Sequence, residues 1–69
     1  ILKIFTMFYV YVLYSKNFTR HYTGMAIDVL KRLKQHNLMQ NKSTKAYVPW
    51  KLIYTEEFKT RKEARIREK

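Results

Sequence analysis

The sequence predicts an α+β domain with a small sheet, whose elements follow one another in the order β-β-α-β-α. Three observations support this prediction: an apolar run rich in aromatic and β-branched residues near the start, apolar residues at helical spacing in the middle, and an alternating stretch after Pro49. With 69 residues the chain makes one domain at most. A chain of this size buries only about 60% of the surface that its unfolded form exposes, so its core must be thin.

The first two strands are predicted on either side of a short polar turn. The segment from Phe8 to Tyr14 is continuously apolar, as expected for a strand that is covered on both faces. The segment from His21 to Met25 is long enough for a second strand, and residues 16–20 between the two are polar. Two strands around a turn of this length should pair as an antiparallel hairpin.

A helix is predicted to follow Asp28. The Asp28 carboxylate can accept hydrogen bonds from the unpaired amides of a first helical turn, which makes this residue a suitable N-cap. The apolar residues fall within one arc of about 100°, which should face the core; they are Val29, Leu30 and Leu33. Arg32 and His36 lie on one shoulder of that arc. We expect both to reach over the sheet edge into a cleft, without being central to the core.

The second half of the chain is predicted to hold a loop, a strand and a helix. Residues 38–48 are polar and basic, and Pro49 ends this loop. Residues 50–58 alternate between apolar and polar side chains and predict a third strand, with Ile53 breaking the alternation. The sequence TRKE at residues 60–63 is a capping box, in which the Thr hydroxyl and the Glu side chain satisfy the start of a helix. This helix runs to the end of the chain, where we expect it to be truncated.

The charge balance points to a polyanionic partner. Lys and Arg number 15 against 5 acidic residues, which gives a formal net charge of +10. So much like charge on a small domain repels itself unless a polyanion is near, and nucleic acid is therefore the first partner to consider. The alternative is a solubilising surface or a ribosome-associated fragment. The chain has no cysteine, which excludes disulfides and thiolate zinc sites and suits a reducing compartment. We expect a cytoplasmic protein.

The apolar opening of the chain does not predict a membrane segment. It is 14 residues long and is interrupted by Lys3, whereas a helix that spans a bilayer needs about 20 apolar residues. It also lacks the small-residue cleavage site of a signal peptide. We therefore expect no membrane partner, and take residues 7–69 as one domain and residues 1–6 as an N-terminal extension.

Several polar residues are candidates for a site. Tyr11 and Tyr22 lie on the first two strands, where tyrosines most often pack against their neighbours. The single glycine, Gly24, lets a backbone adopt a conformation that bulkier residues resist, or lets another group approach closely. Arg32 could clamp a phosphate with its planar fork. His36 could hold that group, donate to it or accept from it. The plain alternative is a surface arginine and a half-buried histidine.

Glu68 is a further candidate, because it lies on the same helical face as Ala64, which should face the sheet. An acid on an inward helical stripe is costly unless it has a partner. Two alternatives are that Arg65 or Arg67 neutralises Glu68, or that a frayed helix end leaves it in water.

Together these residues resemble the GIY-YIG endonuclease superfamily. The pattern runs through Tyr9-Val10-Tyr11, Tyr22-Thr23-Gly24, Arg32 and Glu68. The stretches "FYVYVLYS", "HYTGMAIDVLKRLKQHN", "KSTKAYVPWKLIYTEEF" and "TRKEARIREK" are similar to the small stand-alone bacterial members, and to the nuclease domain of the excision-repair incision subunit. The first motif departs from the family pattern, because Tyr9 stands in place of its glycine, and Met25 replaces a residue that can be Lys or Ser.

The resemblance implies a three-stranded antiparallel sheet flanked by helices, with an active site on one face. It implies four catalytic residues: Tyr11, Tyr22, Arg32 and His36. Gly24 would let the strand turn beside the cleft. Glu68 would hold a single divalent metal, Mg²⁺ or Mn²⁺. The family fold usually continues beyond this acid, which is the basis for expecting a truncated helix here.

The implied function is hydrolysis of DNA phosphodiester bonds by a structure-directed endonuclease, of the kind used in DNA repair, with no small-molecule substrate. Lysines would contact phosphates without reading sequence; they are Lys31, Lys34, Lys42 and Lys45. A nucleic-acid-binding module of the same fold without turnover is the first alternative. A basic structural or ribosome-associated protein is the second.

Overall fold

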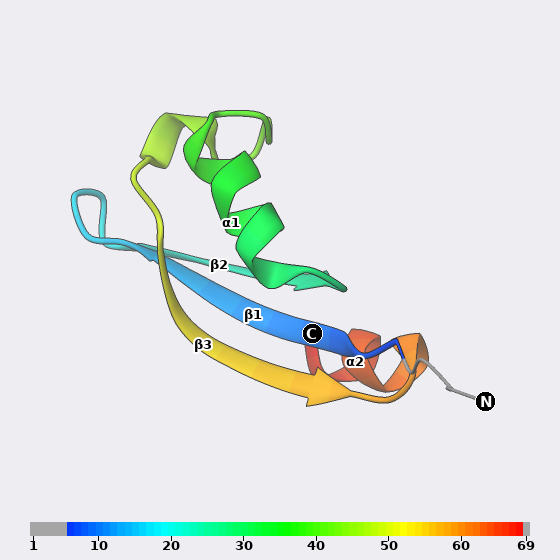
Figure 1. The fold of residues 1–69 in the computed structure, drawn as a ribbon. Coiled ribbons are helices and arrows are strands. Elements are labelled where there is room, and N and C mark those ends of the chain that lie inside the picture. The colour runs from blue at the N-terminus through cyan, green and yellow to red at the C-terminus, as the bar shows by residue number, and fades with distance from the viewer. Residues whose placement is uncertain (1–5, 69) are drawn as a thin grey trace.

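A computed structural model describes residues 6–68 and confirms the predicted fold class (Figure 1). The elements are β1 (Phe8–Ser15), β2 (Arg20–Ala26), α1 (Val29–Asn37), a 3-10 helix η1 (Lys45–Tyr47), β3 (Lys51–Phe58) and α2 (Arg61–Glu68). The three strands form one antiparallel sheet in the order β2-β1-β3. Most of the predicted extension, residues 1–5, lies outside the described part of the chain, as does Lys69.

The central strand β1 sets the register of the sheet. Tyr11 is paired with Gly24 on β2 and with Thr55 on β3. Side chains alternate between the two faces of a strand, so the side chains of Tyr11 and Leu13 lie on one face and the side chain of Val10 lies on the other. The pairing with β3 shifts between Val12 and Leu13.

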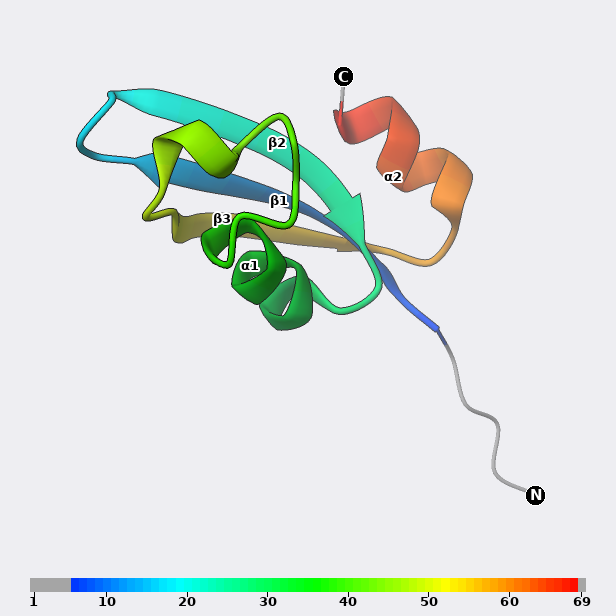
Figure 2. The same ribbon diagram turned by 90° about the horizontal axis from the view of Figure 1, so that it is seen from above.

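The two helices cover opposite faces of the sheet, as Figures 1 and 2 show. Under α1 lies the core, formed by Tyr11, Leu13 and Trp50, with Val29 and Leu33 of α1 packed against it. The other face is covered by α2 at the end of the sheet near Val10, and Ala64 of this helix is fully buried, as its predicted inward position requires. The predicted strand covered on both faces is thus confirmed for β1.

Both predicted helix starts are confirmed. The Asp28 side chain caps α1 by accepting from the Lys31 amide at 3.0 Å. At α2 the Thr60 hydroxyl accepts from the Glu63 amide at 3.2 Å, which is the N-cap bond of a capping box, and it donates to the Glu63 carboxylate at 3.0 Å. No helix in the described part of the chain is long and apolar enough to cross a membrane.

The predicted buried face of α1 was wrong in two places. Leu30 is 71% exposed, whereas His36 is only 1% exposed. The buried stripe is centred on Val29, Leu33 and His36, which follow helical spacing, with half-buried Arg32 on its flank. Leu30 lies about 100° from Val29 around the helix and therefore points to solvent. Both Arg32 and His36 were expected on the shoulder of the apolar arc. Arg32 lies at the edge of the buried face, whereas His36 lies at its centre.

The segment between α1 and β3 is more ordered than the predicted polar loop. It contains η1, and Trp50 anchors it, although this residue lies just before β3 and not within it. The side chain of Asn37 bonds both backbone groups of Trp50, accepting from N at 2.6 Å and donating to O at 3.0 Å. The Trp50 indole N–H donates to the Thr44 carbonyl at 3.0 Å. These bonds hold the segment against the end of α1.

Candidate active site

Gly24 allows Tyr11 to lie flat across the neighbouring strand. A Cβ atom built on Gly24 would lie 2.5 Å from both Cζ and the hydroxyl oxygen of Tyr11, much closer than any real contact. Gly24 lies within β2 and its φ is not positive. The expectation that this glycine lets the strand turn was therefore wrong, and the close approach of another group is the reason for it. Because Gly24 has no side chain, the Tyr11 ring can occupy the space above it.

The hydroxyl of Tyr11 begins a line of buried hydrogen bonds. It lies 3.0 Å from Nε2 of His36, and Nδ1 of the same ring lies 2.7 Å from the Thr44 hydroxyl. All three side chains are at most 1% exposed. Strand β1, helix α1 and the segment before η1 thus each contribute one group, and the fold brings them together from distant parts of the sequence.

Arg32 lies one helical turn before His36 and carries an unused donor. Its Nη1 donates to the Gln35 side chain at 3.3 Å. Its Nε is buried, and within residues 6–68 it has no hydrogen-bond partner. Burying a donor without a partner costs free energy, so this N–H fits an acceptor that arrives from outside. The guanidinium group also lies beside the Tyr11 hydroxyl.

The surroundings shift the pKa values of Tyr11 and His36 in opposite directions. Burial is the main cause that raises the pKa of Tyr11, and the charges of Tyr22 and Glu68 add to it, while the hydrogen-bonding and charge of Arg32 oppose it. Burial, followed by the Arg32 charge, lowers the pKa of His36 below its usual 6.5. At neutral pH the phenol is therefore protonated and the imidazole is neutral, so the imidazole can accept a proton.

Tyr22 completes an aromatic cluster around His36. Its ring centroid lies 4.9 Å from that of His36 and 6.3 Å from that of Tyr11. Trp50 packs edge-on at 6.4 Å. The cluster restricts the imidazole ring to one orientation.

Glu68 is the half-buried last residue of α2. Its charge is the smallest of the causes that raise the pKa of Tyr11. The alternative in which Arg67 neutralises Glu68 is not what the structure shows, because Arg67 pairs with Glu56 at 2.8 Å. Residues 6–68 contain no group of three or more metal-ligating side chains. A divalent ion here would have one carboxylate ligand, with water and phosphate oxygens in its other positions, which fits Mg²⁺.

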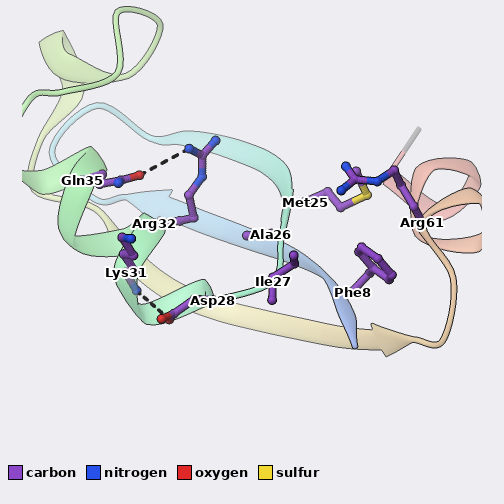
Figure 3. Close-up of a pocket in the computed structure, with 9 residues that line it drawn as sticks. All are labelled: Phe8, Met25, Ala26, Ile27, Asp28, Lys31, Arg32, Gln35 and Arg61. Carbon is purple, nitrogen blue, oxygen red and sulfur yellow. Dashed lines mark hydrogen bonds between the residues drawn. The ribbon is translucent and has the colours of Figure 1, made fainter. Parts of the chain in front are cut away.

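A cleft of about 350 Å³ opens next to Arg32 and extends toward the start of α2. Figure 3 shows Arg32 of α1 and Arg61 of α2 on either side of the end of β2. Lys31 also lines the cleft, and Asp28 is the acid among the lining residues. Three cations against one acid make the cleft electrostatically favourable for an anion. A second cleft of about 200 Å³ is lined by Arg32 and His36, among others.

The structure brings most of the predicted site residues together. Five of them lie close together around the Tyr11–His36 hydrogen bond; they are Tyr11, Tyr22, Gly24, Arg32 and His36. Lys31 lines the cleft of about 350 Å³. The other predicted lysines are exposed and do not line it; they are Lys34, Lys42 and Lys45.

Three polar residues at the site were missed from sequence. Gln35 could have been noticed on the Arg32 side of the helix. Arg61 belongs to the capping box and had no separate signal. Thr44 lies in an irregular segment, and no spacing links it to His36.

The fold and the site define a class: a small α+β domain in which a buried tyrosine–histidine hydrogen bond lies near an arginine that lines a cationic cleft. The chain belongs to the GIY-YIG catalytic domain family, whose sequence profile it matches over residues 7–69. This is a family of nucleases, so its members act on nucleic acid.

Two relatives with similar sequences are found. The chain is 44% identical over 57 residues to a UPF0213 protein of Streptococcus agalactiae serotype V, and equally to one of serotype III. In each case the match covers 81% of this chain and 64% of the relative. The chain thus spans less than two thirds of the length of these relatives. No solved structure matches it significantly.

Proposed function

We propose that this chain is the catalytic domain of a structure-directed DNA endonuclease that hydrolyses phosphodiester bonds with one divalent metal, Mg²⁺ or Mn²⁺. The observation that carries the proposal is the buried Tyr11–His36 hydrogen bond beside Arg32, whose Nε has no partner among the described residues. Such an arrangement costs stability in the free protein. It is useful if a phosphate supplies the missing acceptor.

Arg32 binds the scissile phosphate in this proposal. Its buried Nε–H and its charge meet a phosphoryl oxygen, on which negative charge grows as the reaction proceeds. Lys31 and Arg61 hold the neighbouring backbone in the same cleft. Lys34, Lys42 and Lys45 lie on the surface and would add contacts that read no sequence. Because these groups contact phosphates and not bases, they suit a DNA substrate that is recognised by its structure.

In this proposal Tyr11 and His36 take up the proton of the attacking water. The raised pKa of Tyr11 disfavours a standing phenolate, so the phenol needs an acceptor for its own proton. The attacking water gives a proton to the Tyr11 oxygen while the Tyr11 proton passes to Nε2 of neutral His36. The water oxygen forms the new bond to phosphorus, and the bond from phosphorus to the leaving sugar oxygen breaks. Tyr22 keeps the His36 ring in line by packing against it.

Glu68 is the proposed metal ligand. Its carboxylate is the acid of α2 whose charge acts on Tyr11, which supports this residue as the one that would hold the ion. When bound, the ion supplies positive charge to the phosphate and the leaving oxygen. The Glu68 charge adds slightly to burial in raising the pKa of Tyr11, so both favour the protonated phenol.

The test compares cleavage with binding on supercoiled, nicked, linear and branched DNA, with and without Mg²⁺. We expect Mg²⁺-dependent cleavage that prefers branched or nicked DNA. Arg32→Lys should keep the charge but lose the planar fork, so cleavage should fall about 100-fold or more with little loss of affinity. Arg65→Lys, on the exposed side of α2, is the matched control and should change neither.

Binding without any cleavage would contradict the proposal and favour the alternative, a binding module of the same fold. Equal losses of affinity and cleavage in Arg32→Lys would make Arg32 a phosphate anchor only.

A further inference from the structure

The Thr44 hydroxyl is the far end of the buried hydrogen-bond line. It lies 2.7 Å from Nδ1 of His36 and is 1% exposed. The backbone of Thr44 is fixed on both sides: its amide donates to the Asn41 carbonyl at 3.2 Å, and its own carbonyl accepts from the Trp50 indole at 3.0 Å. The backbone that carries this hydroxyl is thus held in place, on one side by a buried tryptophan.

A neutral imidazole has one N–H and one lone pair, so the partner of one nitrogen decides what the other can do. If Thr44 accepts from Nδ1–H, the lone pair of Nε2 faces the Tyr11 hydroxyl. If Thr44 instead donates to Nδ1, the Nε2–H points at Tyr11 and His36 cannot receive its proton.

The surroundings of Tyr11 favour the first arrangement. The Arg32 guanidinium, which opposes the raised pKa of Tyr11, has only donors, so the Tyr11 oxygen can serve toward Arg32 only as an acceptor. The Tyr11 proton is then free to point at Nε2 of His36, 3.0 Å away. Nδ1 must in that case carry the ring proton, and the Thr44 oxygen is the group that receives it.

The groups around the His36 ring are Tyr11 of β1, Tyr22 of β2, Arg32 of α1 and Thr44. No described hydrogen bond joins this ring to a carboxylate. A carboxylate in the place of Thr44 would favour the imidazolium form. A hydroxyl can orient the ring without adding charge, so the imidazole remains neutral and able to accept a proton.

We infer that Thr44 is a positioning residue: it fixes His36 as the Nδ1–H tautomer, so that Nε2 accepts the proton of Tyr11 during hydrolysis. The role in hydrolysis rests on the proposed function. The tautomer itself is a property of the free protein and can be measured without substrate.

The experiment records the imidazole ¹⁵N shifts of the whole chain at about pH 8, where a histidine with an ordinary pKa near 6.5 is neutral. In the wild type, Nδ1 of His36 should carry the proton and Nε2 should show the shift of an unprotonated nitrogen. His21, which is exposed, is the internal control in the same spectrum. Thr44→Val keeps the shape and removes the acceptor, so the Nε2–H form of His36 should appear. Thr44→Ser should restore the wild-type shifts.

The same variants are then assayed for Mg²⁺-dependent nicking. Thr44→Val should lower kcat by about 10- to 100-fold, the range seen when the partner that orients a metal-bound histidine is removed, with KM unchanged. Thr44→Ser should recover most of the rate.

Two results would overturn the inference: an Nε2–H tautomer of His36 in the wild type, which needs no variant to fold, or unchanged kcat in a folded Thr44→Val. The inferred tautomer in a wild type that cleaves nothing would support the assignment of the ring proton and contradict the nuclease proposal alone.

Discussion

Tyr11 is the residue on which the site is built, and its position depends on the missing side chain opposite it. The ring is fully buried, crosses β2 at Gly24, and reaches the imidazole of His36. Because the hydroxyl lies 3.0 Å from Nε2 of His36, small movements of the ring would break this hydrogen bond.

The first prediction concerns Gly24→Ala. The new methyl group would lie 2.5 Å from the Tyr11 ring, so the ring must move within a packed core. We expect the free energy of unfolding to fall by about 1–3 kcal/mol, the usual cost of overpacking, and cleavage to fall more steeply. Urea unfolding measures the first effect and plasmid nicking the second. Thr23→Ala, at the exposed neighbouring position, is the control and should stay within about 0.5 kcal/mol. Unchanged nicking in Gly24→Ala would show that the Tyr11 position is not critical.

The second prediction concerns pH and His36. Its pKa is lowered in the folded protein, so between the folded value and the unfolded value near 6.5 the unfolded chain binds more protons. The free energy of unfolding should therefore fall as pH drops below about 6.5. Cleavage should fall in the same range, with a midpoint below 6.5, because protonated His36 cannot accept from Tyr11.

Urea unfolding between about pH 5 and 8 tests this effect. His36→Gln should remove this part of the pH dependence, whereas His21→Gln should keep it. An acid midpoint for cleavage above 6.5 would contradict a lowered pKa of His36.

At the scale of elements, the site is assembled by β1, β2, α1, α2 and the segment before η1. Helix α2 runs only from Arg61 to Glu68, and its capping box stabilises the end opposite to Glu68. A helix this short depends on its cap and on its packing, since few intrahelical hydrogen bonds support it. The position of Glu68 therefore depends on Thr60.

The third prediction is that Thr60→Ala destabilises α2 by about 1 kcal/mol, the usual cost of losing an N-cap. The apparent affinity for Mg²⁺ in the cleavage assay should weaken, whereas kcat at saturating Mg²⁺ should change little. A Mg²⁺ titration of nicking measures both quantities, and Thr60→Ser is the conservative control. An unchanged Mg²⁺ dependence in Thr60→Ala would mean that α2 does not position the metal ligand.

The local elements were predictable because their signals are local. The apolar run of β1, the N-cap Asp28 and the capping box at Thr60 each act within a few residues, and all three are confirmed. The burial of His36 in place of Leu30 was not predictable in this way, because it depends on which side of α1 meets Tyr11.

The site residues likewise divide into those that could be predicted from the sequence and those that could not. The resemblance to a family picked out Tyr11, Arg32 and His36, and the structure places them together. Thr44 was missed because its contact with His36 depends on the path of an irregular segment that Trp50 holds in place. For Gly24 the sequence left two roles open, a special backbone conformation or the close approach of another group, because only the register joins Gly24 to Tyr11.

At the scale of the whole molecule, charge determines how the domain meets its substrate. The formal net charge of +10 is carried by a chain of 69 residues. Many of the cations lie on both helices and on the segment between α1 and β3, and Lys31, Arg32 and Arg61 line the cleft. A polyanion can therefore contact much of the surface while one phosphate enters the cleft.

The fourth prediction is that DNA affinity falls steeply and log-linearly with salt, because binding releases the counterions of each contacted phosphate. Fluorescence anisotropy at several salt concentrations gives the slope. Lys45→Ala should reduce the slope by about 1 if this exposed lysine contacts a phosphate. Affinity that barely changes between low and physiological salt would contradict the nucleic-acid interpretation of the charge.

The most direct test of a metal-dependent active site is plasmid nicking by Glu68→Gln, with DNA affinity measured on the same samples. Glutamine keeps the size of the side chain and removes the charge that a hard divalent cation requires. We predict that Mg²⁺-dependent nicking nearly vanishes, while affinity holds or rises slightly because one negative charge has left a phosphate-binding site. Normal Mg²⁺-dependent turnover by a folded Glu68→Gln variant would contradict the assignment of the metal ligand and, with it, the proposed active site.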